Sequence, residues 1–164
     1  MSLKVLLAGS YDPITSGHFS LIEKCASRFD EVHVVAFINA EKKALFSVSQ
    51  REEMLKIACR PFANVVTGSD SGYVVDYAAR HGIALLIRGV RDQTDFAYEK
   101  IMADNNRKLN PQILTMFIPA DPAWQQVSSH LVKDRIAAGQ AYAPLLPPGV
   151  GDYIAGVQGL SEKL

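Results

Sequence analysis

The sequence predicts an α/β protein whose single domain is built on a doubly wound, five-stranded parallel sheet. Short apolar runs alternate with helical patterns along the chain, and strands separated by helices require right-handed βαβ crossovers. The 164 residues suffice for one domain with a substantial core and are few for two. A hydrophobic fraction of 48% and a charged fraction of 21% are ordinary for a globular protein and exclude a disordered chain.

Five apolar runs are predicted to form the strands of this sheet. They cover residues 3–8, 32–38, 64–67, 84–87 and 113–118. The run at 32–38 is rich in β-branched and aromatic residues, which favour strands. Gly9 and Pro119 are placed to end the first and the last run. A parallel sheet of such runs is expected to be covered by helices on both faces.

Helical patterns fill the intervals between these runs. The expected helices cover residues 17–28, 47–59, 70–81, 94–109, 128–138 and 150–156. At the second helix, Ser47 with Gln50 and Ser49 with Glu52 both fit a capping box, so the pattern leaves two starts open.

Capping residues mark the other helix ends. Asp70 or Ser71 can cap the third helix, and Gly82 and Gly139 are placed to end the third and the fifth. Prolines break the chain after residue 140. Residues 140–164, approximately, are therefore expected to form a helical tail of the one domain, which spans residues 1–164.

The charges of the chain cancel. It carries 17 Lys and Arg against 17 Asp and Glu, so its formal net charge is zero. This balance argues against nucleic acid or an anionic membrane as a partner bound by bulk electrostatics. It leaves room for a local cluster of positive charge that faces one phosphorylated ligand.

Cysteine usage and hydropathy indicate a cytoplasmic protein. Cys25 and Cys59 are too few for a disulfide framework or a four-cysteine metal site and are expected to be reduced structural thiols. No apolar run approaches the roughly 20 residues that cross a bilayer. The start of the chain also lacks the pattern of a signal peptide.

Ligands of doubly wound sheets bind at the carboxyl ends of the strands, so polar residues just after a strand are the candidates for a site. The residues selected in this way are Gly9 to His18, Asn39, Glu41, Lys42, Lys43, Arg88, Arg91, Trp124, Ser128 and Ser129. Cations and hydrogen-bond donors dominate this set. The sequence therefore predicts an anionic, phosphorylated ligand.

The segment after the first strand carries the most information. Gly9 and Gly17 do not form the dinucleotide fingerprint, and no Gly-Lys-Ser/Thr of a P-loop follows. A glycine turn nevertheless leads into a helix N-terminus, whose free N–H groups can hold phosphate oxygens. His18 lies in the first turn of that helix, where position alone fits a phosphate ligand and a capping residue equally well.

The other candidates have structural alternatives. Arg88 and Arg91 suit phosphate, because the guanidinium fork donates two bonds at once, but they also fit a solvated loop. The pair 128–129 fits a helix cap, the pair 42–43 fits a solvated loop, and Trp124 fits either the core or a surface that covers a flat ring.

The remaining histidines are expected to be structural, and no metal site is expected. His33 alternates within an apolar strand and should be packed, and His81 should lie at a helix C-terminus. No cluster of His, Cys, Asp and Glu has metal-ligand spacing in the sequence.

Several blocks of the sequence resemble a known family. Residues 12–18 resemble the [ST]-x-G-H signature of the nucleotidyltransferase superfamily. Residues 42–46, 87–91, 95–99 and 128–133 are similar to blocks of the bacterial phosphopantetheine adenylyltransferases. The blocks occur in order and at the right spacing over residues 3–155, approximately, so the resemblance is specific.

The resemblance implies a Rossmann-like fold and a reaction. AMP would pass from ATP to 4′-phosphopantetheine by direct in-line displacement, giving dephospho-coenzyme A and pyrophosphate in coenzyme A biosynthesis. It also implies Mg²⁺ held mainly by the ATP phosphates, a homohexamer, and feedback binding of coenzyme A.

The resemblance further implies site residues. The catalytic positions are His18, Lys42 and Arg91, of which His18 stabilises the transition state. The acceptor is expected to contact Ser10, Lys42, Val74 and Arg88. ATP is expected to contact Ser10, Tyr11, His18, Gly89, Val90, Arg91, Glu99, Trp124, Gln125, Gln126, Val127, Ser128, Ser129 and His130.

Three positions depart from the family pattern. Tyr11 stands where Phe is usual, Ala97 where the family has Glu, and His130 where it has a third successive serine. His130 would bring a titratable ring toward the ATP phosphates or point away from them. Two alternatives therefore stay open: a sister nucleotidyltransferase for nicotinamide mononucleotide or a sugar or polyol phosphate, and a nucleotide-binding module without catalysis.

Overall fold

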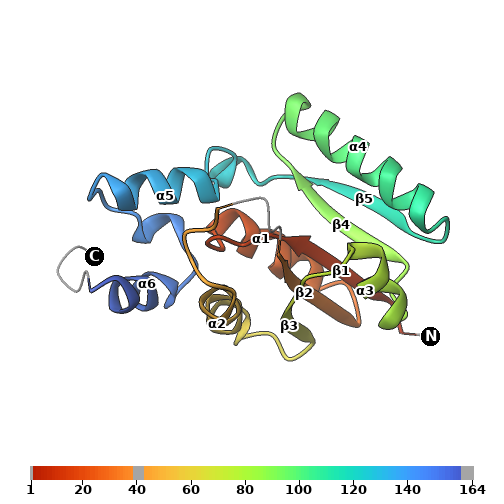
Figure 1. Ribbon diagram of the computed structural model, residues 1–164, viewed down its shortest axis with the longest axis horizontal. Helices are drawn as coiled ribbons and strands as arrows, with labels where there is room; N and C mark the ends of the chain where they lie inside the picture. The colour runs from red at the N-terminus through yellow and green to blue at the C-terminus, as the bar shows by residue number, and fades with distance from the viewer. Residues whose placement is uncertain (1, 39–42, 160–164) are drawn as a thin grey trace.

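A five-stranded parallel sheet organises the computed structural model, which describes residues 2–38 and 43–159. Its strands are β1 (Lys4–Gly9), β2 (Glu31–Phe37), β3 (Val65–Asp70), β4 (Leu85–Val90) and β5 (Leu114–Pro119). They are ordered β3-β2-β1-β4-β5, and each neighbouring pair is parallel. The predicted fold class, a Rossmann-like doubly wound α/β sheet, is confirmed (Figure 1).

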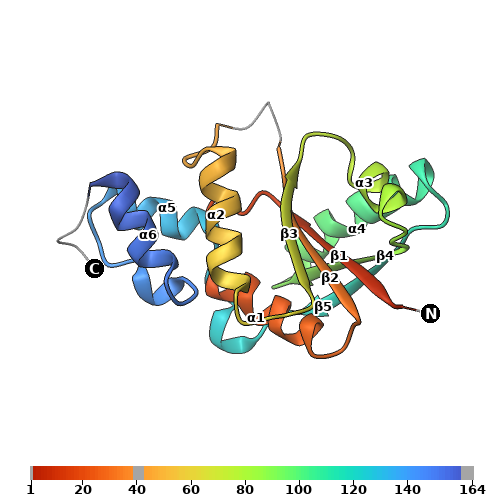
Figure 2. The ribbon, with the colours of Figure 1, turned by 90° about the horizontal axis from the view of Figure 1, so that it is seen from below.

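Helices follow each strand as predicted. They are α1 (Ser16–Ala26), α2 (Val48–Cys59), α3 (Val74–Arg80), α4 (Gln93–Leu109), α5 (Ser129–Ala137) and α6 (Val150–Gln158), with short 3₁₀ helices η1 (Pro122–Trp124) and η2 (Ala143–Leu145). Figures 1 and 2 show α3 and α4 on one side of the sheet and α1 and α2 on the other. The C-terminal helix α6 lies beside α2 (Figure 2).

The alternation of side chains along β1 divides the core into two clusters. Val5 and Leu7 face the cluster that includes residues of α1, α2 and α6. Leu6 and Ala8 face the cluster that includes residues of α3. Because both faces of the central strands are covered, the strand sequence is a continuous apolar run instead of an alternating one. The free cysteines, Cys25 and Cys59, are both buried, as predicted.

The capping box of α2 is confirmed in one of its two predicted forms. The Ser47 hydroxyl accepts a bond from the Gln50 backbone N–H (3.2 Å), and the Gln50 side-chain oxygen accepts one from the Ser47 N–H (2.8 Å). The start of α3 differs from the prediction. Helix α3 begins after Tyr73, which makes no side-chain cap, because Asp70 still belongs to β3 and accepts a bond from the Gly72 N–H.

Strand β4 is longer than predicted, and this changes how Arg88 is held. Arg88, Gly89 and Val90 extend the strand instead of following it, and they pair with residues 117–119 of β5. The length of a strand depends on its partner, and the apolar pattern of 84–87 does not contain that partner. The sheet therefore fixes the backbone of Arg88.

The strand order creates a crevice between β1 and β4. From β1 the chain winds outward to β2 and β3, and it then returns to β4 and β5 on the other side. Ligands of doubly wound sheets bind where the winding reverses, at the carboxyl ends of the strands. Within residues 2–38 and 43–159, no helix is both long and apolar enough to span a membrane.

Candidate active site

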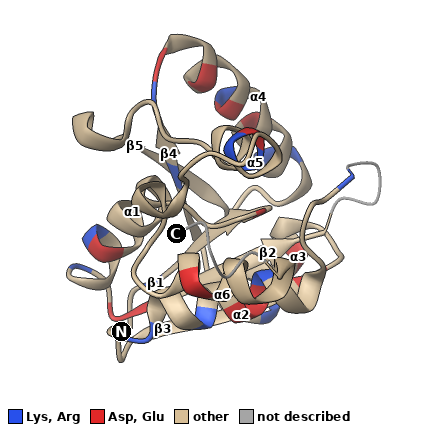
Figure 3. Ribbon diagram, turned by 90° about the vertical axis from the view of Figure 1, so that its left-hand side faces the viewer, with Lys and Arg blue, Asp and Glu red and all other residues tan. Residues whose placement is uncertain are grey.

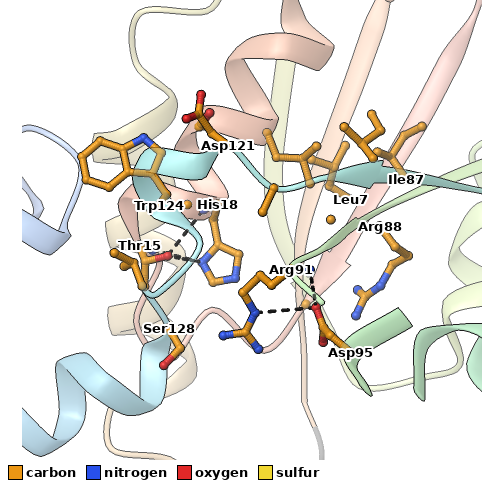
Figure 4. Close-up of a pocket in the computed structure, with 18 of the residues that line it drawn as sticks. Leu7, Thr15, His18, Ile87, Arg88, Arg91, Asp95, Asp121, Trp124 and Ser128 are labelled. Carbon is orange, nitrogen blue, oxygen red and sulfur yellow. Dashed lines mark hydrogen bonds and ion pairs between the residues drawn. The ribbon is translucent and has the colours of Figure 1, made fainter. Parts of the chain in front are cut away.

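A cavity of about 280 Å³ lies at the carboxyl ends of β1 and β4, at the predicted reversal of the sheet. Its walls come from the turn after β1, the first turns of α1, the end of β4, helix α4, and the segment between β5 and α5 (Figure 4). Segments far apart in the sequence therefore meet in one hollow. This is the arrangement expected for a ligand pocket.

Most of the predicted site residues line this cavity. They are Ser10, Tyr11, His18, Arg88, Gly89, Arg91, Glu99, Trp124, Val127, Ser128 and Ser129. Four others, Val90, Gln125, Gln126 and His130, do not line it. Val74 lines a second cavity, and Lys42 lies outside the described residues.

The turn after β1 has a conformation that its residues make possible. Tyr11 adopts a positive φ of 46°, is 4% exposed, and donates a hydrogen bond from its hydroxyl to the Leu7 carbonyl (3.1 Å). A Cβ at Gly9 would lie 3.1 Å from the Tyr11 ring, so glycine makes room for this ring. The buried tyrosine thereby fixes the backbone of the turn beneath the cavity.

Two charged side chains anchor the same turn to other elements. Arg51 of α2 is 5% exposed and donates a bond to the Ser10 carbonyl (3.0 Å). The buried Asp12 carboxylate accepts bonds from the backbone N–H groups of residues 45–46 (3.0 and 2.9 Å) and lies 3.2 Å from the Lys133 ammonium of α5. The turn is therefore held in place by both α2 and α5.

His18 is a capping residue and a pocket residue at the same time. Its Nδ1 accepts a bond from the Thr15 backbone N–H (3.1 Å), while the Thr15 hydroxyl accepts one from the His18 backbone N–H (3.4 Å). The two residues form the capping box of α1. Because Nδ1 is the acceptor, the proton of the neutral ring lies on Nε2. The capping interpretation is therefore confirmed, and the position of His18 in the cavity wall leaves its role as a phosphate ligand a prediction.

The surroundings of His18 keep its ring neutral. Burial lowers its pKa, and the positive charges of Arg88 and Arg91 lower it further, to about 4. At neutral pH the ring is an uncharged donor through Nε2–H. A neutral donor can bond a phosphate oxygen without first losing a proton.

Arg91 lies at the mouth of the cavity and is loosely held. Its Nε lies 3.6 Å from the Asp95 carboxylate, and its side chain is 41% exposed. Its backbone is more firmly placed, since the N–H donates to Asp95 (3.0 Å) and the carbonyl accepts from the Gln125 side chain (2.8 Å). Gln125 thereby joins the segment after β5 to the end of β4, and its predicted contact with ATP stays a prediction.

Arg88 and Glu99 form a partly buried ion pair in the wall of the cavity, with Glu99 its buried member. Arg88 donates from Nε to one Glu99 oxygen (2.7 Å) and from Nη2 to the other (2.5 Å), and its Nη1 bonds the Ala8 carbonyl. Burial lowers the pKa of Arg88, but the hydrogen bond and the charge of Glu99 outweigh burial and raise it. The guanidinium stays charged within a neutral pair.

The start of α5 contributes polar groups to the cavity wall. The Ser128 hydroxyl caps the helix by accepting a bond from the Leu131 N–H (3.1 Å), and the Ser129 hydroxyl donates to the Pro13 carbonyl (2.7 Å). The His130 side chain is 84% exposed and lies 3.4 Å from the Asp134 carboxylate, outside the cavity. In this structure the unusual His130 points away from the site.

A second cavity of about 150 Å³ adjoins the first. Arg88 and Glu99 line both cavities, so their ion pair lies on the boundary. The walls of the second cavity are mostly apolar and include Phe37, Val74 and Met102. A narrow apolar space beside a charged floor suits an extended substrate with a phosphate at one end.

Sequence reasoning missed part of both cavities. Lys24, Asp95 and Asp121 line the first cavity, and none of them directly follows a predicted strand in the way the selection required. Tyr98, Met102 and Asn106 of α4 line the second cavity. Their spacing of four residues places them on one helix face, and this spacing was a signal that the sequence contained.

The charged residues of the helices are mixed in sign. Figure 3 shows acidic and basic residues interspersed on α2 and α4, which is consistent with the neutral total. Among residues 2–38 and 43–159, no group of three or more His, Cys, Asp or Glu is placed to hold a metal ion.

Comparisons with known proteins agree with this geometry. Residues 6–135 match the model of the cytidylyltransferase-like family. The chain is 37% identical over 147 residues to the phosphopantetheine adenylyltransferase of Shouchella clausii, covering 90% of this chain and 92% of the relative. It is 39% identical over 151 residues to the phosphopantetheine adenylyltransferase of Finegoldia magna, covering 92% and 93%.

The sheet, the histidine at the start of α1 and the arginines at the end of β4 define a nucleotidyltransferase. Such enzymes hold a nucleotide at the carboxyl edge of the sheet and need no covalent help from the protein. The chain belongs to the cytidylyltransferase-like family and, within it, groups with the phosphopantetheine adenylyltransferases.

Proposed function

We propose that the protein transfers the adenylyl group of ATP to 4′-phosphopantetheine, forming dephospho-coenzyme A and pyrophosphate. The observation that carries this proposal is the pair of adjoining cavities with Arg88 on their boundary. Two phosphorylated molecules, one in each cavity, would meet at Arg88. Both relatives described above bear the name of this activity. Their names therefore give no support to the two alternatives, a different acceptor or a binding module without catalysis.

The larger cavity suits ATP. His18 offers Nε2–H, Arg91 offers a positive charge, and the N-termini of α1 and α5 offer free N–H groups to phosphate oxygens. The Trp124 ring and the apolar Leu21 line the same cavity and suit a flat base.

The smaller cavity suits the extended arm of 4′-phosphopantetheine. Val74, Phe37 and Met102 offer apolar contact, and Asn106 offers an amide that can bond the amide groups of such an arm. Arg88 lies where the phosphate at the end of the arm would reach the nucleotide. The proposal includes Lys42 as a second cation for this phosphate, as the family resemblance implies.

The reaction requires positioning more than proton transfer. The acceptor phosphate is an anion at neutral pH and attacks the α-phosphorus of ATP in line. A new phosphorus–oxygen bond forms as the bond to the bridging oxygen of the β-phosphate breaks, and pyrophosphate leaves with its electron pair. His18 donates a hydrogen bond to the charge that grows on the α-phosphate oxygens.

Mg²⁺ fits this proposal as a partner of the ATP phosphates. The carboxylates that line the larger cavity are engaged, Glu99 with Arg88, Asp95 with Arg91, and Asp121 as the cap of η1. The ion would neutralise phosphate charge, and the residues of the chain hold and orient the two substrates.

The oligomer implied by the resemblance is also part of the proposal. Four apolar side chains of α4 and β5 are strongly exposed: Tyr98 (56%), Ile101 (60%), Leu109 (63%) and Leu114 (61%). Exposed apolar groups gathered on neighbouring elements favour an interface, and we infer a homohexamer that covers this surface. The proposal also includes feedback binding of coenzyme A, because coenzyme A contains the same arm as the acceptor. It further includes a cytoplasmic location, which suits the free thiols of the two cysteines.

The test is release of pyrophosphate from ATP with different acceptors. Purified protein with ATP and Mg²⁺ is supplied with 4′-phosphopantetheine, nicotinamide mononucleotide or glycerol 3-phosphate. Turnover with 4′-phosphopantetheine alone supports the proposal. Turnover with another acceptor would identify a sister enzyme, and ATP binding without any turnover would identify a binding module.

A further inference from the structure

We propose that Tyr77 is a positioning residue for the acceptor, because it fixes Phe37 and Val74 in the wall of the smaller cavity, and that His33 holds Tyr77 in place. This inference rests on the proposed function, which assigns the smaller cavity to the acceptor arm. Tyr77 lines neither cavity, so it acts through the residues that do.

The Tyr77 ring packs along one face of strand β2. Residues 33, 35 and 37 point to the same face, because side chains alternate along a strand. Helix α3, which carries Tyr77, lies over this face (Figure 1). The Tyr77 ring meets the His33 ring edge-on, with centroids 5.7 Å apart and an interplanar angle of 71°. It meets the Phe37 ring edge-on as well, at 5.9 Å and 80°, and so joins His33 to a residue of the smaller cavity.

His33 is held by two hydrogen bonds. It is 3% exposed, and its Nδ1 lies 2.8 Å from the Tyr77 hydroxyl while its Nε2 lies 2.7 Å from the Glu31 carboxylate. The bonds from His33 and Lys4 lower the pKa of Glu31, so this carboxylate is charged at neutral pH and can only accept. Nε2 of His33 therefore carries a proton, and in the neutral ring Nδ1 accepts the Tyr77 O–H. The hydroxyl of Tyr77 thereby has a fixed partner on the sheet.

The backbone and the second face of the Tyr77 ring are also held. The His81 ring stacks on it with centroids 4.0 Å apart, and His81 Nδ1 lies 2.9 Å from the Tyr77 carbonyl. Val74 lies three residues before Tyr77 on α3, so the two are neighbours on the helix surface. A helix of seven residues has little stability of its own, and its place over the sheet depends on its buried residues. Tyr77, which is 8% exposed, therefore sets the place of Val74.

The two cavities differ in their dependence on this packing. Phe37 and Val74 are the contributions of β2 and α3 to the smaller cavity, and α4 supplies Met102 and its neighbours. Within the described part of the chain, no residue of β2 or α3 lines the larger cavity. A displaced Tyr77 would shift Phe37 and Val74 relative to α4, and with them the space for the arm. The contacts of ATP would stay intact.

The experiment compares Tyr77→Leu, which removes the ring, with Tyr77→Phe, which keeps the ring and removes the hydroxyl. Tyr142→Phe is the matched control. Tyr142 is 2% exposed, lines neither cavity, and its hydroxyl makes no hydrogen bond within residues 2–38 and 43–159.

Four quantities are measured for each protein. Calorimetry gives the affinity for 4′-phosphopantetheine, and steady-state kinetics gives kcat and the KM of this acceptor. The fluorescence of Trp124, the single tryptophan of the sequence, gives the affinity for ATP, because Trp124 lines the larger cavity. The NMR signals of the Val74 methyl groups report the wall of the smaller cavity without any ligand, and melting temperatures report the fold.

We expect Tyr77→Leu to weaken acceptor binding and raise its KM by about 10-fold, the scale of a lost apolar contact in a pocket, with ATP affinity within about 2-fold of wild type. Tyr77→Phe keeps the contact with Phe37 and loses only the bond to His33, so acceptor affinity should fall by about 3-fold. Tyr142→Phe should change neither affinity. The Val74 methyl signals should move in both Tyr77 variants and not in the control.

Two results for folded Tyr77→Leu would overturn the inference. Acceptor and ATP affinities that fall equally would mean a general loss of structure, and an unchanged acceptor affinity would mean that Tyr77 only stabilises the fold. If Tyr77→Leu does not fold, Tyr77→Phe decides, and an acceptor affinity equal to that of Tyr142→Phe overturns the inference. If wild type neither bound nor used 4′-phosphopantetheine, the proposed function would fail. Unmoved Val74 methyl signals in the Tyr77 variants would then still overturn the positioning of the wall, and moved signals would support it.

Discussion

The two arginines at the end of β4 differ in how they are held, although each has a carboxylate partner on α4. Arg88 is bonded through two donors to a buried glutamate, and its backbone belongs to the sheet. Arg91 lies three residues further on, is 41% exposed, and its Nε is 3.6 Å from Asp95. A tightly paired arginine presents its remaining N–H donors in a fixed direction, but its charge is largely cancelled by its partner. A loosely paired arginine presents its positive charge to a ligand and can move with it.

Under the proposed function, we infer that this difference divides the work of the site between its two sides. On the nucleotide side, we expect Arg91 to follow phosphate groups whose charge is redistributed as pyrophosphate leaves. On the acceptor side, we expect Arg88 to set the line of attack. His18 lines the nucleotide cavity and supplies a neutral donor, because burial and then the charges of both arginines lower its pKa.

The largest expected effect is that of His18→Ala. We expect kcat to fall by about 10²- to 10⁴-fold, because a donor to the transition state is lost, while ATP affinity changes much less. Stopped assays of pyrophosphate and titration of the Trp124 fluorescence measure the two quantities. A kcat within a few-fold of wild type would reduce His18 to a helix cap.

Lysine substitutions at the two arginines should separate direction from charge. Arg88→Lys should lower kcat/KM for the acceptor by about 10- to 100-fold, because an ammonium cannot make the paired bonds to Glu99. Arg91→Lys keeps a charge in a loose pair and should lower ATP affinity by less than about 10-fold. Steady-state kinetics with each substrate varied in turn test this. Equal losses for the two variants would show that the difference in pairing has no functional consequence.

The burial of His18 beside two arginines also predicts that the stability of the fold depends on pH in the acid range. Its pKa is about 4 in the folded protein and near 6.5 when unfolded. As the pH falls from 6.5 toward 4, the unfolded chain takes up a proton that the folded chain does not, so folding loses up to about 3 kcal/mol. Urea unfolding at pH 7 and at pH 4.5 should show a smaller acid loss for His18→Gln than for wild type. An identical loss would contradict a neutral His18, and its NMR titration gives an independent value.

The smallest effect is expected at the exposed pair. Asp95→Asn should change the free energy of unfolding by less than about 1 kcal/mol, since exposed ion pairs contribute little. Its loss frees Arg91 and should make ATP affinity more sensitive to salt. Thermal unfolding and ATP titrations at two ionic strengths measure these effects. A loss of about 3 kcal/mol or more, as expected when one partner of a buried ion pair is removed, would mean that this pair is held as tightly as the pair of Arg88 and Glu99.

The fold was predictable because its signals are local and repeated. Each central strand is a continuous apolar run, and the box of Ser47 and Gln50 marks the start of α2. The end of β4 was not predictable in this way, because Arg88 to Val90 are held in the strand by β5. Asp70 failed as a helix cap for the same reason, since pairing with β2 extends β3 to include it.

The site residues that could be predicted are those that directly follow a strand. Ser10, His18 and Arg91 line the cavity as expected. The pairing of Arg88 with Glu99 was not predictable from periodicity, because it joins a strand to a helix across 11 residues and depends on how α4 packs. The second cavity depends on the same packing, although the spacing of Tyr98 and Met102 on α4 hinted at a shared face.

The capping box of α1 has a consequence for protein engineering. Position N3 of such a box ordinarily favours Glu or Gln, which reaches back to the N-cap N–H, and here His18 performs that bond through Nδ1. A stabilising redesign would therefore choose glutamate at this position. Under the proposed function that choice would place a negative charge where a phosphate binds, and we therefore expect this one side chain to set a trade-off between thermostability and turnover.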